Sequence, residues 1–90
     1  MIVEYLFIGH GLDGQIKKDD YPQQKLMVVE VEVVTAGNGS RGKPVKLFEV
    51  TQHQYQGEFY AVAIGRSTDS VEINRLIENS GVKPIPKELL

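Results

Sequence analysis

The chain has no cysteine, and none of its apolar runs is long enough to cross a membrane. Without cysteine it has no disulfide scaffold, no thiol catalysis and no zinc–thiolate site. A helix that spans a bilayer needs about 20 apolar residues. The apolar start of the chain lacks the basic residues of a targeting segment and is interrupted by Glu4. We therefore expect a cytoplasmic protein that does not associate with a membrane.

The chain also has little excess of charge of either sign. The formal net charge is −2, so no long-range field draws the whole chain toward nucleic acid or an anionic membrane. Residues 25–48 are the exception, because they carry a net charge of +2. This modest basic excess makes nucleic acid a candidate partner for residues 25–48, although the rest of the chain is acidic.

Residues 25–35 show the clearest pattern, an alternation of apolar and polar side chains typical of a strand with one buried face. The apolar odd positions are Met27, Val29, Val31 and Val33, and Glu30 and Glu32 lie between them. We expect the odd positions to face the core and the glutamates to face solvent.

Residues 2–8 are apolar at both even and odd positions, which predicts a strand covered on both faces, either as an interior strand or by partial capping with the helix. Residues 9–24 are the least regular stretch and predict a long surface loop. Within it, the pair Asp13-Gly14 is typical of a hairpin turn. A short return strand over 15–18 would follow that turn.

The second half of the chain predicts two further strands. Residues 45–51 form the first, and its apolar phase switches between Leu47 and Phe48, which indicates a bulge or burial on both faces. Residues 52–57 then turn the chain into a strand at 58–64.

A helix is predicted directly after that strand. Asp69 followed by Glu72 is a capping-box arrangement, and Gly81 suits the left-handed position that ends a helix. The apolar stripe consists of Ile73, Leu76 and Ile77. Ala61 and Ala63 on the preceding strand would let this helix pack closely against the sheet.

These elements predict one α+β domain over residues 1–90, in the order β-β-β-β-α, with 83–90 as an extended tail. We expect a strongly twisted antiparallel sheet of four or five strands, because consecutive strands joined by turns favour a meander. A single helix covers only one side of such a sheet. The other side must be solvated, curled into a partial barrel, or covered by another subunit.

The segment from Gly9 to Gly14 is the first candidate for function. His10 stands between glycines, and Asp13 could orient its ring or share a metal ion with it. Two ligands do not make a zinc site, which takes at least three from the protein. The glycines also match G-x-G-x-x-G, but the helix that a dinucleotide site needs does not follow. Turn-forming glycines and a solvent-facing histidine remain the simpler interpretation.

The loop 40–46 is the second candidate. Arg41, Lys43 and Lys46 could contact phosphates, as flexible hairpin loops do in nucleic-acid-binding proteins. The available aromatic platforms are Tyr5, Phe7, Phe48, Phe59 and Tyr60. Three cations alone give weak, salt-sensitive binding. An ordinary solvated loop is the alternative.

No residue set indicates a catalytic, cofactor or metal site, and the sequence points to no enzyme class. The leading hypothesis is a non-catalytic interaction module that binds another protein or a second copy of itself as a homodimer, through a sheet face or edge that one helix cannot cover. The alternatives are a nucleic-acid-binding accessory protein that uses the 40–46 loop and, more remotely, a small enzyme or metal protein centred on His10 and Asp13. The partner, the oligomeric state and the free sheet edge do not follow from the sequence.

Overall fold

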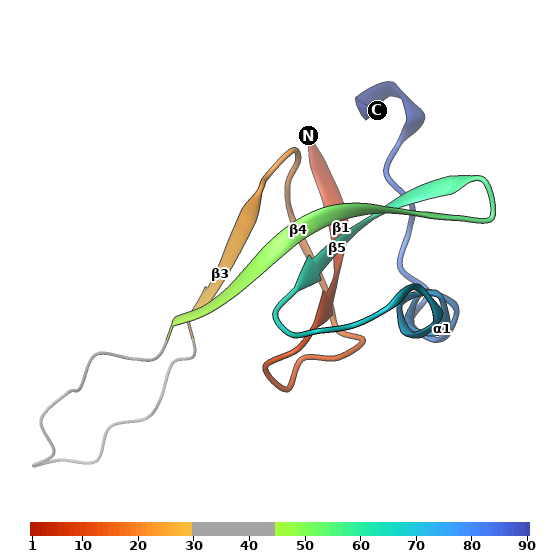
Figure 1. Ribbon diagram of the computed structural model, residues 1–90. Coiled ribbons are helices and arrows are strands. Elements are labelled where there is room, and N and C mark those ends of the chain that lie inside the picture. Colours follow the sequence, from red (N-terminus) through yellow and green to blue (C-terminus); the bar gives the residue numbers. More distant parts are fainter. Residues whose placement is uncertain (30–44) are drawn as a thin grey trace, which may run out of the picture.

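The structure, a computed structural model, describes residues 1–29 and 45–90 (Figure 1). Within these residues, five strands form one sheet in the order β2-β1-β5-β4-β3, and one α-helix follows the last strand. The elements are β1 (Ile2–Ile8), β2 (Ile16–Asp20), β3 (Lys25–Val29), β4 (Val45–Tyr55), β5 (Glu58–Ile64), α1 (Ser70–Ser80) and the 3₁₀ turn η1 (Lys87–Leu89). The sheet curls strongly into a half-barrel. The predicted α+β class, with a twisted sheet and one C-terminal helix, is confirmed.

The pairing of the sheet is mixed, because β1 and β5 run parallel while the other three neighbouring pairs are antiparallel. The chain forms a hairpin, β1–β2, and a meander, β3–β4–β5. These two units join through β1 and β5, which hold most of the buried strand residues. Joining the two most apolar strands at the centre of the sheet covers both of their faces, as expected for an interior strand at 2–8.

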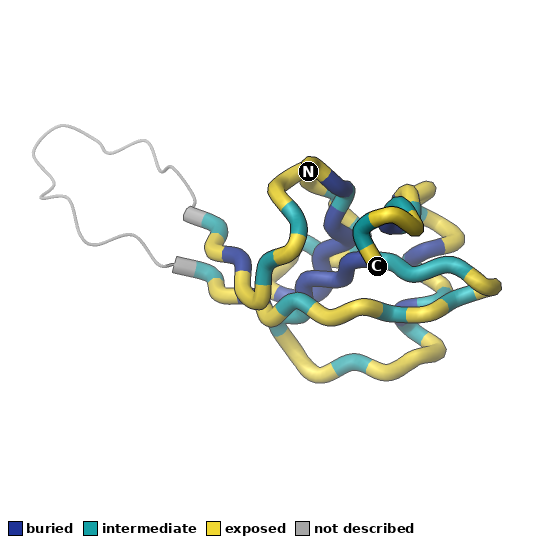
Figure 2. The backbone as a smooth tube through the Cα atoms, turned by 90° about the horizontal axis from the view of Figure 1, so that it is seen from above, coloured by how far each residue is buried: buried dark blue, intermediate teal, exposed yellow. Residues whose placement is uncertain are grey.

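The buried residues, which lie mostly on the central strands (Figure 2), form a separate core on each face of the sheet. The concave face holds Val3, Tyr5, Phe7, Leu26, Phe48, Ala61, Ala63 and Ile85. The opposite face holds Leu6, Ile8, Val62, Ile73, Ile77 and Val82. Because the side chains of a strand alternate between faces, β1 contributes to both cores.

The helix α1 begins and ends as its sequence predicts. The Asp69 carboxylate accepts the backbone N–H of Glu72 at 2.9 Å, and Gly81 ends the helix in the left-handed conformation at φ 74°. The Glu72 side chain does not return to the cap residue but bonds to Arg66 and Thr68 instead. Among the described residues no helix has the length and apolar content needed to cross a membrane.

The C-terminal tail closes one end of the concave face. Ile85 is 1% exposed, and its backbone N–H donates to the Phe59 carbonyl at 2.7 Å. Lys83 N–H donates to the Glu4 carboxylate at 3.0 Å, and Leu89 packs against the concave core. Curling and this tail together cover the side that the helix leaves bare. The buried residues of the concave core are therefore covered by described residues of the chain itself.

The predicted phase of the strand beginning at residue 25 is wrong. Leu26 is buried and Met27 is 68% exposed, so the even positions face the core. The reason is the cross-strand pairing: Leu26 lies opposite Phe48, whose ring packs edge-on against Phe7 at 4.8 Å. Leu47 lies opposite Met27 on the outer face and is also exposed. Residues 30–35 of the predicted strand lie outside the described residues.

Three further details of the predicted strands change. β4 keeps a regular register through Leu47 and Phe48 and continues to Tyr55. Neither the bulge nor the burial on both faces that the phase switch predicted is present there, because Leu47 is exposed while Phe48 is buried. The turn is the short Gln56-Gly57 pair, so polar residues predicted as a turn lie on the strand. The helix packs on the Val62 face and not on the alanine face, where the aromatic rings of the concave core lie. The return strand after Asp13-Gly14 is present as β2.

Candidate functional site

The parallel pairing of β1 and β5 brings two loops to one edge of the sheet. Gly65 N–H donates to the Ile8 carbonyl at 2.7 Å, which extends the pairing just past the end of both strands. A Cβ on Gly9 would lie 2.8 Å from the Gly65 carbonyl carbon, and a Cβ on Gly65 would lie 2.5 Å from the His10 ring. Glycine is therefore required sterically at both positions, and the loops 9–14 and 65–69 start side by side.

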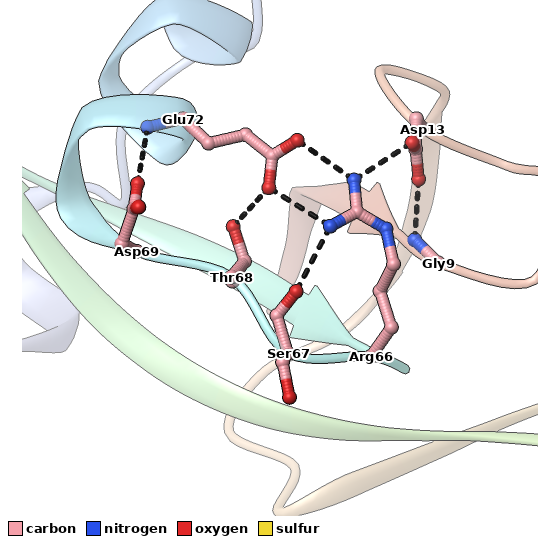
Figure 3. Close-up of polar contacts among 7 residues, drawn as sticks. All are labelled: Gly9, Asp13, Arg66, Ser67, Thr68, Asp69 and Glu72. Atoms are coloured by element: carbon pink, nitrogen blue, oxygen red, sulfur yellow. Dashed lines mark hydrogen bonds and ion pairs between the residues drawn. The ribbon is translucent and has the colours of Figure 1, made fainter.

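Arg66 ties these two loops to the helix (Figure 3). Its guanidinium donates two hydrogen bonds to Glu72, at 2.9 and 2.8 Å, and one to Asp13 at 2.8 Å. Asp13 also accepts Gly9 N–H at 2.6 Å, and Thr68 donates to Glu72 at 2.5 Å. The bonds from Arg66 and Thr68 lower the pKa of Glu72 to about 2, and those from Arg66 and Gly9 lower the pKa of Asp13.

This cluster is well paired. Among the described residues, every guanidinium bond of Arg66 goes to a carboxylate or to the Ser67 carbonyl, and the Thr68 hydroxyl donates to Glu72. A ligand would have to displace one of these bonds. The arrangement therefore stabilises the loop junction.

The predicted pair His10 and Asp13 is not brought together as a site. Asp13 faces Arg66, whereas the His10 ring packs edge-on against Phe48 at 5.1 Å, with Nε2 3.3 Å from the Leu47 carbonyl. The other histidine, His53, bonds to Asn74 of the helix at 2.7 Å. Within residues 1–29 and 45–90, no group of three or more histidine, cysteine, aspartate or glutamate side chains could hold a metal ion.

The two candidate loops do meet at one point, because Lys46 Nζ donates to the His10 carbonyl at 3.2 Å. Arg41 and Lys43 lie outside the described residues. Tyr5, Phe7 and Phe48 are buried in the concave core, so they do not form the platform for stacking bases that the sequence offered.

A second feature is the gap between the two edge strands of the half-barrel, β2 and β3, which we call the wedge. β2 and β3 diverge from a common corner at residues 21–24 (Figure 1). A pocket of about 150 Å³ lies between these two strands. Its lining consists of Phe7, Lys17, Lys18, Asp19, Leu26, Met27 and Val28. Lys17 Nζ lies 6.0 Å from the centroid of the Phe7 ring, which lines the same pocket.

The outer edge of β3 pairs with no other strand among the described residues. Val50 N–H donates to the Gln24 carbonyl at 2.8 Å, which fixes the phase of the hydrogen bonds between β3 and β4. In an antiparallel pair the bonded positions alternate, so the backbone groups of Lys25 and Met27 point away from β4. Exposed Met27 and Leu47 lie side by side next to this edge.

Sequence reasoning missed both Arg66 and the wedge. Arg66 follows the last strand directly, a position that signals an edge of the sheet, but its partners are distant in sequence and only the parallel pairing brings Asp13 to it. The wedge depends on β2 and β3 lying at opposite edges, which a simple meander would not produce. Comparisons with protein-family models, with curated proteins and with solved structures found no match for this chain.

Proposed function

We propose that this protein is a non-catalytic binding module that takes up an extended segment of a partner protein as an added strand along β3. The observation that carries the proposal is the outer edge at Lys25 and Met27, which pairs with no strand among residues 1–29 and 45–90. Outward N–H and C=O groups there are a ready template for main-chain pairing. The exposed apolar pair Met27 and Leu47 adds surface that a bound segment would cover.

Comparison of the two edges favours β3 over β2. Four of the five β2 residues are charged, namely Lys17, Lys18, Asp19 and Asp20. Charged edges of this kind discourage pairing with another chain. The described β3 sequence, KLMVV, holds one charge, at Lys25. Pairing of a partner strand with β3 therefore removes less water from charged side chains than pairing with β2 would.

The same edge of a second copy is the alternative occupant, which would make the protein a homodimer. We place this activity in the cytoplasm, because a chain without cysteine suits a reducing compartment. Light scattering at high protein concentration separates the two cases. A strict monomer leaves a foreign segment as the occupant, whereas a concentration-dependent dimer that Met27→Pro abolishes assigns the edge to self-association.

The direct test uses proline to remove one outward N–H at a time. Met27→Pro deletes a donor that faces away from β4, so the internal sheet keeps its hydrogen bonds. Ile16→Pro is the matched control, because Ile16 has the same outward phase on β2, the opposite edge, and a strand tolerates proline at its first residue. Both variants are first checked for an unchanged circular dichroism spectrum.

Peptides for this test come from a display library of eight-residue linear segments selected on the wild-type chain. We expect the selected peptides to bind wild type and Ile16→Pro alike, and to lose at least tenfold in affinity on Met27→Pro. Hydrogen exchange should show protection of the Lys25 and Met27 amides on binding. Failure to select any peptide, or binding that Met27→Pro leaves unchanged, would refute strand addition at β3.

A further inference from the structure

We propose that the segment held by β3 is recognised by its chemistry: an apolar side chain flanked by carboxylates, read by the pocket between β2 and β3. This inference rests on the proposed strand addition and names the class of partner sequence. It starts from the size of the pocket. A dry cavity of about 150 Å³ holds a benzene-sized group, and the pocket volume is about 150 Å³. It therefore takes one aliphatic or aromatic side chain.

The geometry of an added strand aims a side chain into this pocket. Leu26 and Val28 are the β3 residues whose side chains face the concave side, and both line the pocket. Directly opposite residues in paired strands point to the same face of the sheet. A partner residue opposite either of them would therefore project toward the ring of Phe7, between the two edge strands.

The charges around the pocket select what flanks that residue. Lys17 and Lys18 line it, and neither forms an ion pair with a carboxylate among the described residues. The third charged group, Asp19, already accepts the backbone N–H of Asp20 at 2.7 Å. Two lysines and one carboxylate thus give the lining a net positive charge. Carboxylates beside the apolar anchor complement these cations, and lysines would be repelled.

The test measures the affinity of three acetylated seven-residue peptides by fluorescence anisotropy. All three carry a central leucine. The residues two positions before and after it, whose side chains point to the same face of the strand, are glutamate in the first peptide, serine in the second and lysine in the third, and the other four positions are threonine. The glutamate peptide should bind most tightly and the lysine peptide least. Lys17→Gln should weaken the glutamate peptide two- to fivefold, the range for one partly exposed charge pair. Lys87→Gln, at an exposed lysine on the tail, is the matched control and should have no effect.

A second variant separates the pocket from the edge. Val28→Phe places a ring in the pocket, so the glutamate peptide with leucine at its centre should lose affinity while a version with alanine there does not. Equal affinities for all three peptides, still lost on Met27→Pro, would leave strand addition standing and overturn the chemistry proposed for its ligand. No binding of any peptide to the wild-type chain would overturn both.

Discussion

Replacement of Ile85 by alanine tests whether the C-terminal tail is part of the fold. The Ile85 side chain is 1% exposed in the concave core, and the Ile85 backbone N–H donates to the Phe59 carbonyl at 2.7 Å. If the tail is docked, Ile85→Ala removes apolar contacts from the end of the half-barrel and leaves a cavity. If the tail is loose in solution, the same change removes nothing.

The expected loss in the free energy of unfolding is about 3 kcal/mol, within the range of about 2–5 kcal/mol for large-to-small changes at buried aliphatic positions. For a domain of this size the urea m-value is about 1 kcal/mol per M. The unfolding midpoint in urea should therefore fall by about 2–3 M, measured by circular dichroism. A domain this small has a stability of about 5–13 kcal/mol, so the shift is a large fraction of the whole.

Leu90→Ala is the matched control, because Leu90 belongs to the same tail but is 52% exposed. We expect it to stay within about 0.5 kcal/mol of wild type, as exposed positions do. Ile85→Val should fall between the two, at a cost of about 0.5–1.5 kcal/mol. An Ile85→Ala midpoint indistinguishable from that of Leu90→Ala would refute the conclusion that the tail closes the concave face.

Three further predictions concern the loop junction and the core. Gly65→Ala should cost about 1–3 kcal/mol in urea unfolding, because its Cβ would lie 2.5 Å from the His10 ring; a wild-type midpoint would contradict the close packing. The carboxylates paired with Arg66 have lowered pKa values, so their stabilisation is present above about pH 4–5 and is lost as the pH falls toward 2. Arg66→Met should therefore flatten the acid limb of the stability profile, and parallel limbs would argue against the cluster. Burial raises the pKa of Tyr5 to about 12, and Tyr5 donates a hydrogen bond to the Asp20 carbonyl, so stability should fall between about pH 10 and 12. Tyr5→Phe should remove that part of the loss, and an unchanged alkaline limb would count against it.

The local elements were predictable because their signals are local. The cap at Asp69, the stop at Gly81 and the apolar stripe between them define the helix within a residue or two. The strand at 2–8 was predicted to be covered on both faces, since apolar residues occupy both of them. These features depend on a residue and its immediate neighbours, which the sequence presents in order.

The phase of β3 was not predictable for the opposite reason. Leu26 and Met27 are both apolar, so the described part of the strand offers a core-facing residue in either register. The choice is made by Phe48, which accepts Leu26 as its neighbour across the ladder. The sequence alone does not indicate that Leu26 and Phe48 lie opposite each other.

The candidate site followed the same division. His10 and Asp13 were identified as unusual from their flanking glycines. Their partners lie far along the chain: the Leu47 carbonyl is on β4, and Arg66 is in the loop after β5. The wedge between β2 and β3 required knowledge of the strand order. Partner binding at a sheet edge stays a prediction, and we propose β3 for it because its described part carries fewer charges than β2.

The parallel junction at the centre of the sheet has a consequence for how the chain folds. Tyr5 pairs with Ala61, so the pairing must close a loop of 56 residues before it gains any hydrogen bond. Contacts of such long separation slow folding, since chain entropy is lost before the contacts compensate for it. We expect the hairpin of β4 and β5 to form early and β1 to join last, with φ-values near zero for substitutions at Leu6; values near one would reverse that order. During synthesis β1 is made before β5, so most of its apolar side chains stay exposed to solvent until β5 is available for pairing.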